Sequence, residues 1–374
     1  MSGGPHRSLF RLADPVAPYP IEPSDEELAA SLGLSPERLL RFDMNTLGGG
    51  PLPGVARALA GYDPARLVEY GDQAYRRLRD AISAVTGAPP GRIVPGAGAD
   101  ELIRLVSTSV VGDGDRVVIA IPTFSMFAVE ARLAGASVVE VPRQHPGRRQ
   151  DVGELRAAAE QHGARLLWIC SPNNPTGDAY EPEEIASLAD GLEAVVVVDA
   201  VYQEFAEASL GLPPESLSLL GLQDRLPNLL ILRSLAKAYG LAGARVGYLV
   251  VPEALAERFD GARLPLAIGG PSEAAALGAL ADPAAARARH AIIVAERNRI
   301  ADVLGGMGWE VLPSVTNFLL VRRPDAAKLS EALLREGLVL RAYPDGPLVD
   351  WLRITVRSRA ENDRLLEAIR RLAG

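Results

Sequence analysis

Short apolar runs along this chain alternate with segments in which apolar residues recur at helical spacing. The runs lack polar alternation, which is typical of strands buried on both faces of a parallel sheet. Strands are predicted at Ile93–Val94, Val117–Ile121, Ser137–Val141, Leu166–Cys170, Ala194–Val198, Leu229–Leu232 and Val246–Val251. Helices are predicted at Gln73–Val85, from Leu102 onward, and at Phe127–Ala134, Leu155–Gln161 and Glu183–Leu192. The alternation predicts an α/β fold, with a mostly parallel sheet in a three-layer α/β/α domain.

The pattern changes around Leu264–Pro271, where regular alternation of strand and helix stops. One long, alanine-rich helix is predicted over Ser272–Val303. The segments that follow are strands at Trp309–Leu312, Asn317–Val321, Leu338–Leu340 and Leu352–Val356, with helices at Ala326–Glu336 and at the C-terminus. We expect a large domain over residues 46–268 and a smaller α+β domain over residues 269–374.

The first 45 residues are expected to form an N-terminal arm and helices that join the small domain. Prolines at positions 5, 15, 18, 20 and 23 favour an extended arm. Ser24 and Glu27 have the spacing of a capping box, and Gly33 suits the end of that helix. Ser35 and Pro36 are expected to begin a second helix.

Composition narrows the class of protein. The 374 residues are 48% hydrophobic and 23% charged, which is ordinary for globular domains, and the net charge is −8. The acidic balance and the absence of basic runs argue against nucleic acid and anionic membranes as partners. The one cysteine, Cys170, lies in an apolar run and cannot form an internal disulfide. With no signal-peptide pattern and no apolar stretch long enough to span a bilayer, we expect a soluble, cytoplasmic protein.

Polar residues follow several of the predicted strands directly. Asn173 and Asn174 follow one strand, Asp199 ends the next, and Ser234 follows a third. Because ligands bind beyond the carboxyl ends of parallel strands, these side chains should converge on one crevice. Each also has an ordinary alternative: N-P is a common turn pair and aspartate a common cap. Tyr202, three residues after Asp199, fits either a ligand contact or core packing.

The stretch Ser234–Tyr248 reads SLAKAYGLAGARVGY and combines a serine, a lysine and an arginine in apolar surroundings. Ser234, Lys237 and Arg245 would suit a dianionic ligand that also meets a reactive amine. Considered alone, a lysine of this kind is more typical of an exposed loop, because most lysines are solvated charges.

The turn Pro95–Glu101 lies between a predicted strand and a predicted helix. Such a turn presents backbone N–H groups at a helix N-terminus, where phosphate binds favourably. A plain tight turn explains it as well. As a dinucleotide fingerprint it is incomplete, because Glu101 occupies the position of the third glycine.

Together these strings resemble the fold-type-I, pyridoxal-phosphate (PLP)-dependent aminotransferases of class I/II. The similarity rests on SPNNPTG at 171–177, on DAVY at 199–202 and on the lysine stretch, in that order. It extends over about residues 42–374. The strings GAGADE, PTFSMF, SVTNFLLV and WLRITV most resemble the histidinol-phosphate aminotransferase branch, which acts in histidine biosynthesis.

This resemblance implies a role for each matching residue toward the cofactor. Lys237 would be the Schiff-base lysine, and Asp199 would pair with the pyridine nitrogen. The remaining cofactor contacts that it implies are the following: Tyr202 and Asn174 at the ring oxygen, Phe124 on the ring face, and Ala99, Asp100, Ser234 and Arg245 at the phosphate. Tyr70 would reach the phosphate of a neighbouring subunit, which implies a homodimer. No metal is implied.

It also implies how substrates bind. Arg353 matches the arginine that binds the acidic group of the substrate, with Asn317, Arg341 and Asn45 near it. An amino donor and a 2-oxo acid would use the site in turn, because a planar guanidinium binds carboxylate or phosphate in a bidentate way.

The chain departs from the branch pattern at three places. Ala200-Val201 stands where relatives often have Glu-Ala, which should leave the chemistry unchanged. Residues 45–50, NTLGGG, stand where the branch usually has NENPYG, which puts the substrate in question. Arg357 occupies a position that is commonly glycine, and we expect it on the surface.

Other functions remain open at this point. On the same scaffold they are a decarboxylase of the threonine-phosphate type, an aromatic amino-acid aminotransferase and an amino-acid oxidase. A nicotinamide-dependent dehydrogenase would use the turn at Gly96–Glu101, but it would leave Lys237 without a role. A non-catalytic regulator that binds the cofactor is a further alternative, but no DNA-binding segment in the sequence supports it.

Overall fold

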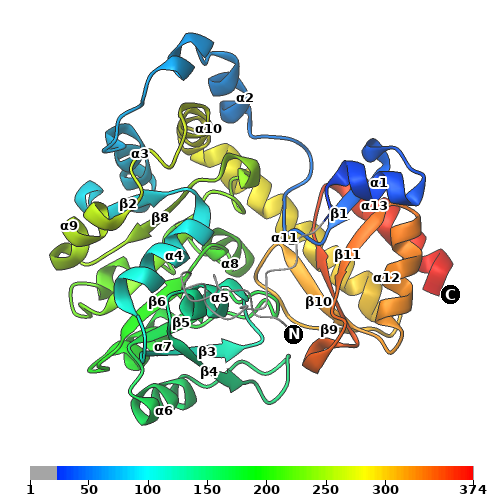
Figure 1. The fold of residues 1–374 in the computed structure, drawn as a ribbon. Coiled ribbons are helices and arrows are strands. Elements are labelled where there is room, and N and C mark those ends of the chain that lie inside the picture. Colours follow the sequence, from blue (N-terminus) through cyan, green and yellow to red (C-terminus); the bar gives the residue numbers. More distant parts are fainter. Residues whose placement is uncertain (1–22, 374) are drawn as a thin grey trace, which may run out of the picture.

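A computed structural model describes residues 23–373, in which the strands form one sheet of seven and one of five (Figure 1). The large sheet has the order β2-β8-β7-β6-β5-β3-β4. Its strands are β2 (Ile93–Gly96), β3 (Arg116–Ile121), β4 (Ser137–Pro142), β5 (Leu166–Cys170), β6 (Val195–Asp199), β7 (Leu229–Ser234) and β8 (Gly247–Val250). They run parallel except β8, which is antiparallel to both β2 and β7. The predicted, mostly parallel sheet is confirmed.

Both faces of the large sheet are covered, as the unbroken apolar runs predict. On β5, Trp168 faces one side, with α4 (Gly98–Val110), α5 (Met126–Leu133) and α9 (Glu253–Ala262). Ile169 faces the other side, with α3 (Arg76–Thr86), α6 (Val152–His162), α7 (Pro182–Ala189) and α8 (Gln203–Leu210). Alternate residues of each strand therefore enter separate apolar layers, each buried side chain contributing about 1.5–3 kcal/mol. The result is the three-layer arrangement.

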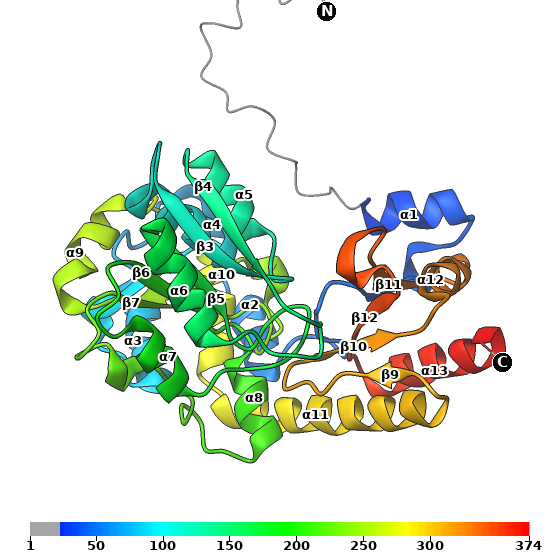
Figure 2. The ribbon, with the colours of Figure 1, turned by 90° about the horizontal axis from the view of Figure 1, so that it is seen from below.

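The small sheet has the order β1-β11-β12-β10-β9. Its strands are β1 (Leu40–Phe42), β9 (Glu310–Val311), β10 (Phe318–Arg322), β11 (Leu338–Ala342) and β12 (Trp351–Thr355). The helices α12 (Ala326–Arg335) and α13 (Arg359–Ala373) pack beside it, as Figure 2 shows. Strand β1 pairs in parallel with β11, so the chain before residue 45 contributes to this sheet.

The N-terminal segment is only partly described. The extended arm predicted over residues 1–22 lies outside the described residues. Helix α1 (Asp25–Leu32) has the predicted capping box between Ser24 and Glu27, and it ends at Gly33 in the left-handed conformation. The second predicted helix is wrong: Pro36–Arg38 forms one 3-10 turn, and the chain then enters β1 after a single residue.

The long helix predicted over Ser272–Val303 is also wrong, because two helices share this segment. They are α10 (Gly270–Leu280) and α11 (Pro283–Gly306). The side chain of Asp282 accepts a hydrogen bond from Ala285 N, and Pro283 occupies the first turn of α11, where its missing N–H costs nothing. Helix α10 packs on α2 (Pro53–Ala60) and α3, whereas α11 runs along the small sheet. The domain boundaries at 45 and 268 stay predictions, and this packing favours a boundary near Asp282.

Candidate active site

The carboxyl ends of β5, β6 and β7 meet at one edge of the large sheet. In the parallel register Cys170 lies opposite Asp199, and Asp199 lies opposite Leu232. Asn174, Asp199 and Ser234 therefore follow or end neighbouring strands, as the sequence predicts. The period of two along a strand also places the side chains of Asp199 and Ser234 on the same face of the sheet.

Lys237 lies three residues beyond β7, and its Nζ donates a hydrogen bond to Met44 O at 2.9 Å. Burial, together with the neighbouring cation of Arg353, lowers the pKa of this amine to about 8. Asp100 and Asp199 oppose this effect, which shows that these charges lie close together. The site thus holds an amine that is partly neutral near neutral pH.

Asp199 is 3% exposed, and its Oδ1 accepts a hydrogen bond from Val201 N at 3.1 Å. Burial raises the pKa of this carboxyl to about 7, while Lys237 acts to lower it. Among residues 23–373 no arginine or lysine forms an ion pair with Asp199. A buried carboxylate without such a pair favours a cationic partner supplied by a ligand.

Tyr202 and Asn45 join the two sheets at the site. Asn45 Nδ2 donates to the Tyr202 hydroxyl at 2.9 Å, and burial raises the pKa of that phenol, so it stays protonated. Asn45 N bonds Thr355 Oγ1 at 3.0 Å, and Asn317 Nδ2 bonds Asn45 O at 3.1 Å. Asn45 is 2% exposed and left-handed at φ 53°. Its side chain is therefore committed to Tyr202 and Thr355.

Arg353 extends from β12 toward the end of β5. Its Nη1 donates to Asn174 Oδ1 at 2.5 Å, and its Nη2 donates to Asp43 O. The guanidinium lies 5.6 Å from the centre of the Phe318 ring. Arg341 on β11 lies opposite Arg353 in the antiparallel register. Arg353 thus brings a cation of the small sheet to the strand ends of the large sheet, with Arg341 as its cross-strand neighbour.

The N-terminus of α4 forms a compact cradle with Arg245. Gly98 is left-handed at φ 85°, and a Cβ built on it would lie 2.7 Å from Arg245 Nη2. A Cβ on Gly247 would lie 3.2 Å from Ala99 N. Arg245 Nη2 bonds Asp100 Oδ2 at 2.7 Å, and both side chains are about half exposed. Only glycine lets the guanidinium approach these backbone N–H groups.

Two further predicted contacts flank this cradle. Ser234 Oγ accepts from Ala236 N at 3.1 Å and donates to Val246 O at 3.3 Å, so it caps the turn that leads to Lys237. Phe124 follows β3, is half-buried, and its ring meets Phe127 edge to face at 5.7 Å.

These residues fit PLP as a ligand. The cradle at Gly98 supplies a helix N-terminus and a guanidinium for a dianionic phosphate. Asp199 supplies a buried anion for a protonated ring nitrogen, and Lys237 an amine for an aldehyde. The fit rests on donor chemistry and on the space that the glycines leave.

Tyr70 stands apart from this group within one chain. It is 87% exposed and lies on the segment between α2 and α3, which extends away from the large sheet (Figure 1). Leu67 and Val68 on the same segment are 63% and 83% exposed. A role for Tyr70 in catalysis therefore depends on a second subunit.

The surface position predicted for Arg357 is wrong. Its side chain is 15% exposed and pairs with Glu361 at 2.7 Å, and it donates to Arg41 O at 3.1 Å. A Cβ on Gly48 would lie 2.0 Å from Glu361 Oε2 and 2.9 Å from Ser358 N. The start of α13 thus packs directly on the glycine loop at 48–50 and leaves no space for a side chain at Gly48.

Several contributors escaped prediction from the sequence. Arg289 of α11 holds the other end of the glycine loop, donating to Gly50 O at 2.9 Å. Asn173, by contrast, was expected at this crevice from the sequence; it accepts from Thr123 Oγ1 at 2.8 Å and donates to Thr176 Oγ1 at 2.8 Å. Backbone carbonyls such as Met44 O carry no signal in a side-chain pattern.

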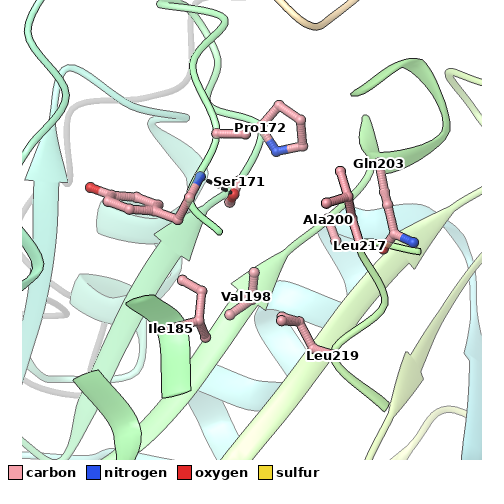
Figure 3. A pocket seen from close by; sticks show the side chains of 10 residues that line it. Ser171, Pro172, Ile185, Val198, Ala200, Gln203, Leu217 and Leu219 are labelled. Carbon is pink, nitrogen blue, oxygen red and sulfur yellow. Dashed lines mark hydrogen bonds between the residues drawn. The ribbon is translucent and has the colours of Figure 1, made fainter. Parts of the chain in front are cut away.

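A small, mostly apolar cavity lies beneath the same strand ends, as Figure 3 shows. Its lining includes Ser171, Val198, Ala200 and Gln203. Val198 and Ala200 face the side of the sheet opposite to the side chain of Asp199. This cavity is therefore separate from the cradle and from Lys237.

The chain belongs to the aminotransferase class I and II family, whose sequence profile matches residues 37–369. It is therefore a PLP-dependent aminotransferase. It is 37% identical over 368 residues to the histidinol-phosphate aminotransferase of Roseiflexus castenholzii, covering 96% of each chain. It is 34% identical to that of Anaeromyxobacter sp., covering 96% of this chain and 97% of the relative. Its fold matches the crystal structure of histidinol-phosphate aminotransferase from Sinorhizobium meliloti in complex with PLP, with a TM-score of 0.83, 30% identity, and coverage of 95% and 96%.

The cradle predicts how one methyl group would affect cofactor binding. Gly98→Ala should weaken PLP affinity by roughly tenfold or more, because the new Cβ meets the Arg245 guanidinium. Gly114→Ala is the matched control: it has a similar φ of 88°, but a Cβ there has nothing within 4 Å. Both variants should lose about 1–2 kcal/mol of stability from backbone strain. Equal PLP affinities in a fluorescence titration would contradict this account of the cradle.

Proposed function

We propose that the chain transfers an amino group between an amino alcohol phosphate, histidinol phosphate, and a 2-oxo acid such as 2-oxoglutarate. The observation that supports this most is the joint placement of Lys237, Asp199 and Arg353 at one edge, in a chain similar over its whole length to histidinol-phosphate aminotransferases. The pair of cations from β11 and β12, Arg341 and Arg353, suits substrates that carry a phosphate or a second carboxylate. The enzyme would then serve histidine biosynthesis.

Each residue has a definable task in this proposal. Bound PLP supplies an electron-withdrawing ring that stabilises negative charge at the substrate α-carbon. Lys237 would attach the cofactor through Nζ and, once displaced, carry the proton to and from that carbon. Asp199 would hold the proton on the ring nitrogen, and the Tyr202 hydroxyl, fixed by Asn45, would donate to the ring oxygen.

The other site residues would bind and orient. Ala99, Asp100, Ser234 and Arg245 would hold the phosphate at the start of α4, and Phe124 would cover one ring face. Asn174 Oδ1 is occupied by Arg353, which turns the amide Nδ2 outward as a donor for the ring oxygen. Arg353, Arg341, Asn317 and Asn45 would form the substrate side. Because Asn45 and Asn317 bond to each other, we assign them to shaping this side.

A panel of substrates tests the reaction. With 2-oxoglutarate as acceptor, we expect glutamate from histidinol phosphate at a kcat/KM at least about tenfold above that for histidine or phenylalanine, which lack the phosphate. Preference for phenylalanine or tyrosine would instead favour the aromatic aminotransferase. Carbon dioxide released from O-phosphothreonine would favour the decarboxylase, and oxygen consumption the oxidase.

The pKa of Lys237 predicts how cofactor uptake depends on pH. The neutral amine is the reactive form, and with a pKa of about 8 it makes up about one tenth of the population at pH 7. PLP uptake by cofactor-free protein should therefore quicken roughly tenfold between pH 7 and 9 and then level off. Stopped-flow absorbance measures this rate. A rate that still rises above pH 10 would show an ordinary, solvated lysine.

We also propose a homodimer in which Tyr70 reaches the neighbouring site. Leu67, Val68 and Tyr70 with Leu264 form an exposed apolar set on one chain, of the kind that a partner covers. A closed two-fold pair would place each Tyr70 near the other cradle. The cytoplasmic location stays a prediction; among the helices of residues 23–373, none is both long and apolar enough to cross a bilayer.

Subunit hybrids test this arrangement. Lys237→Ala and Tyr70→Ala should each be poorly active at limiting PLP. When the two variants are mixed one to one and re-equilibrated, half of the dimers are hybrids. In each hybrid, one of the two sites has both native residues. Activity should then rise to about a quarter of the native value. If Tyr70 acted on its own subunit, no hybrid site would be complete and activity would not rise.

A further inference from the structure

Arg233 is a buried cation directly beside the site, on the face of the large sheet opposite to Asp199 and Ser234. It lies on β7 just before Ser234, and its side chain is 5% exposed. Leu229, Ile231 and Arg233 alternate onto the face that α8 covers. Arg233 cannot touch a ligand in the cradle, so neither the cofactor nor the substrate explains its charge.

Three acceptors from the segment after β6 surround its guanidinium. Nη1 donates to Gln203 Oε1 at 2.9 Å, and Nη2 donates to Glu204 Oε1 at 2.8 Å. Both nitrogens also reach the carboxylate of Glu215, at 3.3 Å each. Gln203 and Glu204 are the first two residues of α8, which begins immediately after Asp199–Tyr202. The cation therefore ties the end of β7 to the start of α8.

The loop after α8 is held in the same network. Glu215 is left-handed at φ 61°, a conformation that side-chain-bearing residues rarely adopt. Gln203 Nε2 bonds Glu207 Oε1 at 2.8 Å, and Leu217 N bonds the same oxygen at 3.2 Å. An unfavourable backbone conformation that persists beside an ion pair indicates that the surrounding contacts fix it.

A buried ion pair by itself is weak evidence for stability, since apolar side chains of equal volume often stabilise as well. An apolar residue could not supply directed hydrogen bonds. The planar guanidinium of Arg233 fixes three acceptors relative to one strand. One of those acceptors, Gln203, follows Tyr202 directly in the chain, and a short turn joins Tyr202 to Asp199. The same strand leads, through the Ser234 cap, to Lys237.

We propose that Arg233 is a positioning residue, which sets the start of α8 against the end of β7 and thereby holds Asp199 and Lys237 in register across the site. This inference rests on the roles proposed above for Asp199 and Lys237, and it adds one for a residue that contacts neither ligand. Helix α8 also packs against α11, and Figure 2 shows it next to the start of that helix. From α11, His290 Nε2 lies 2.9 Å from Ala238 O, on the same lysine loop.

Titratable groups on every neighbouring element face this network. They are Glu204 and Glu207 on α8, Glu215 on the following loop, Tyr239 beyond Lys237, Tyr248 on β8 and His290 on α11. Burial raises the pKa of Tyr239 and Tyr248 and lowers that of His290. The test follows the titration of Lys237, because Arg233 would determine how deeply that amine is buried.

The test compares Arg233→Met with Arg92→Met in the full chain. Arg92 is the matched control: it is 9% exposed, and it donates to Gln223 Oε1 at 2.6 Å and Asp224 Oδ1 at 3.2 Å. It lies just before β2, at the end of that strand opposite to Gly96 and the cradle. The pH dependence of Lys237 acylation is measured by peptide mass in cofactor-free protein, and PLP affinity by fluorescence.

Arg233→Met should raise the acylation midpoint of Lys237 by about one pH unit, because a loosened site admits water and relieves the burial of the amine. It should also weaken PLP binding by roughly tenfold. Arg92→Met should lose thermal stability without either change, and Arg233→Lys should fall between native and Arg233→Met.

The inference is overturned if Arg233→Met and Arg92→Met both lower Tm while the midpoint and PLP affinity stay native. Should Arg233→Met fail to fold, Glu215→Gln is the variant that decides. We expect it to raise the acylation midpoint of Lys237 by a smaller amount, and an unchanged midpoint would refute the idea. Failure of the role proposed for Lys237 has a different signature, because native Lys237 would then not be the residue that PLP labels, and failure of the proposed substrate appears only in the substrate panel.

Discussion

Lys237→Ala is expected to reduce transamination by roughly 10⁴-fold or more. The variant loses both the amine that would attach the cofactor and the base that would move the α-proton, and each contribution is large. Burial and nearby cations keep this amine reactive, with a pKa of about 8. The decisive measurement is the single-turnover rate with saturating PLP and amino donor, which separates slow chemistry from slow cofactor exchange.

The sequence offers a natural control, because the chain contains two lysines, Lys237 and Lys328. Lys328 lies exposed on α12, far along the chain from the strand ends. Lys328→Ala should keep native activity within about twofold. Substantial activity in Lys237→Ala would remove the amine from the mechanism, whatever the fold.

Asp199→Asn has the second-largest expected effect, a loss of roughly 10³-fold in kcat. Removing one partner of a buried ion pair typically costs about 3–5 kcal/mol, and here the partner would be the protonated ring nitrogen. The amide keeps the size of the side chain, and its oxygen can still accept a weaker hydrogen bond from Val201 N. The fold should therefore survive. Circular dichroism and Tm should confirm that the fold remains intact.

A cofactor analogue separates charge from shape in that variant. PLP methylated at the ring nitrogen keeps a positive charge without needing a carboxylate to hold a proton. It should restore a large part of the activity of Asp199→Asn and none of that of Lys237→Ala. Asp224→Asn, at an exposed carboxylate beside Arg92, is the neutral control. No rescue by the analogue would contradict the role of Asp199 in holding the proton on the ring nitrogen.

The sheet edge was the most predictable part of this molecule. Leu166–Cys170 forms β5 with the predicted bounds, because five buried apolar residues leave one solution, a central strand. The rule that parallel strands present their carboxyl ends together then brings Asn174, Asp199 and Ser234 to one place. Local pattern and global topology agree there.

Predictions failed where a single residue decided between two local solutions. Helical spacing continues through residues 272–303, yet Asp282 and Pro283 end one helix and begin another. Helices α2, α8 and α9 were not predicted, since short amphipathic segments between strands give weak periodic signals. Arg357 was misplaced because it is buried against Arg41 O, which lies far from it along the chain, while its other partner, Glu361, is a neighbour on the next turn.

The substrate side was predictable only in outline. The sequence singles out Arg353 but gives no sign that Asn45 would be committed to Tyr202 and Thr355. Nor does it show that α11 and α13 clamp the glycine loop through Arg289 and Glu361. These contacts depend on how the two sheets are arranged, which no local pattern encodes.

The most direct test of the account is the position at which PLP is attached. The holoenzyme is reduced with borohydride and digested after arginine. Cleavage after Arg233 and after Arg245 releases Ser234–Arg245 as one peptide. The account predicts one pyridoxyl group per chain, on Lys237 within that peptide. A label on Lys328, or a native enzyme active in transamination without any label on Lys237, would contradict it.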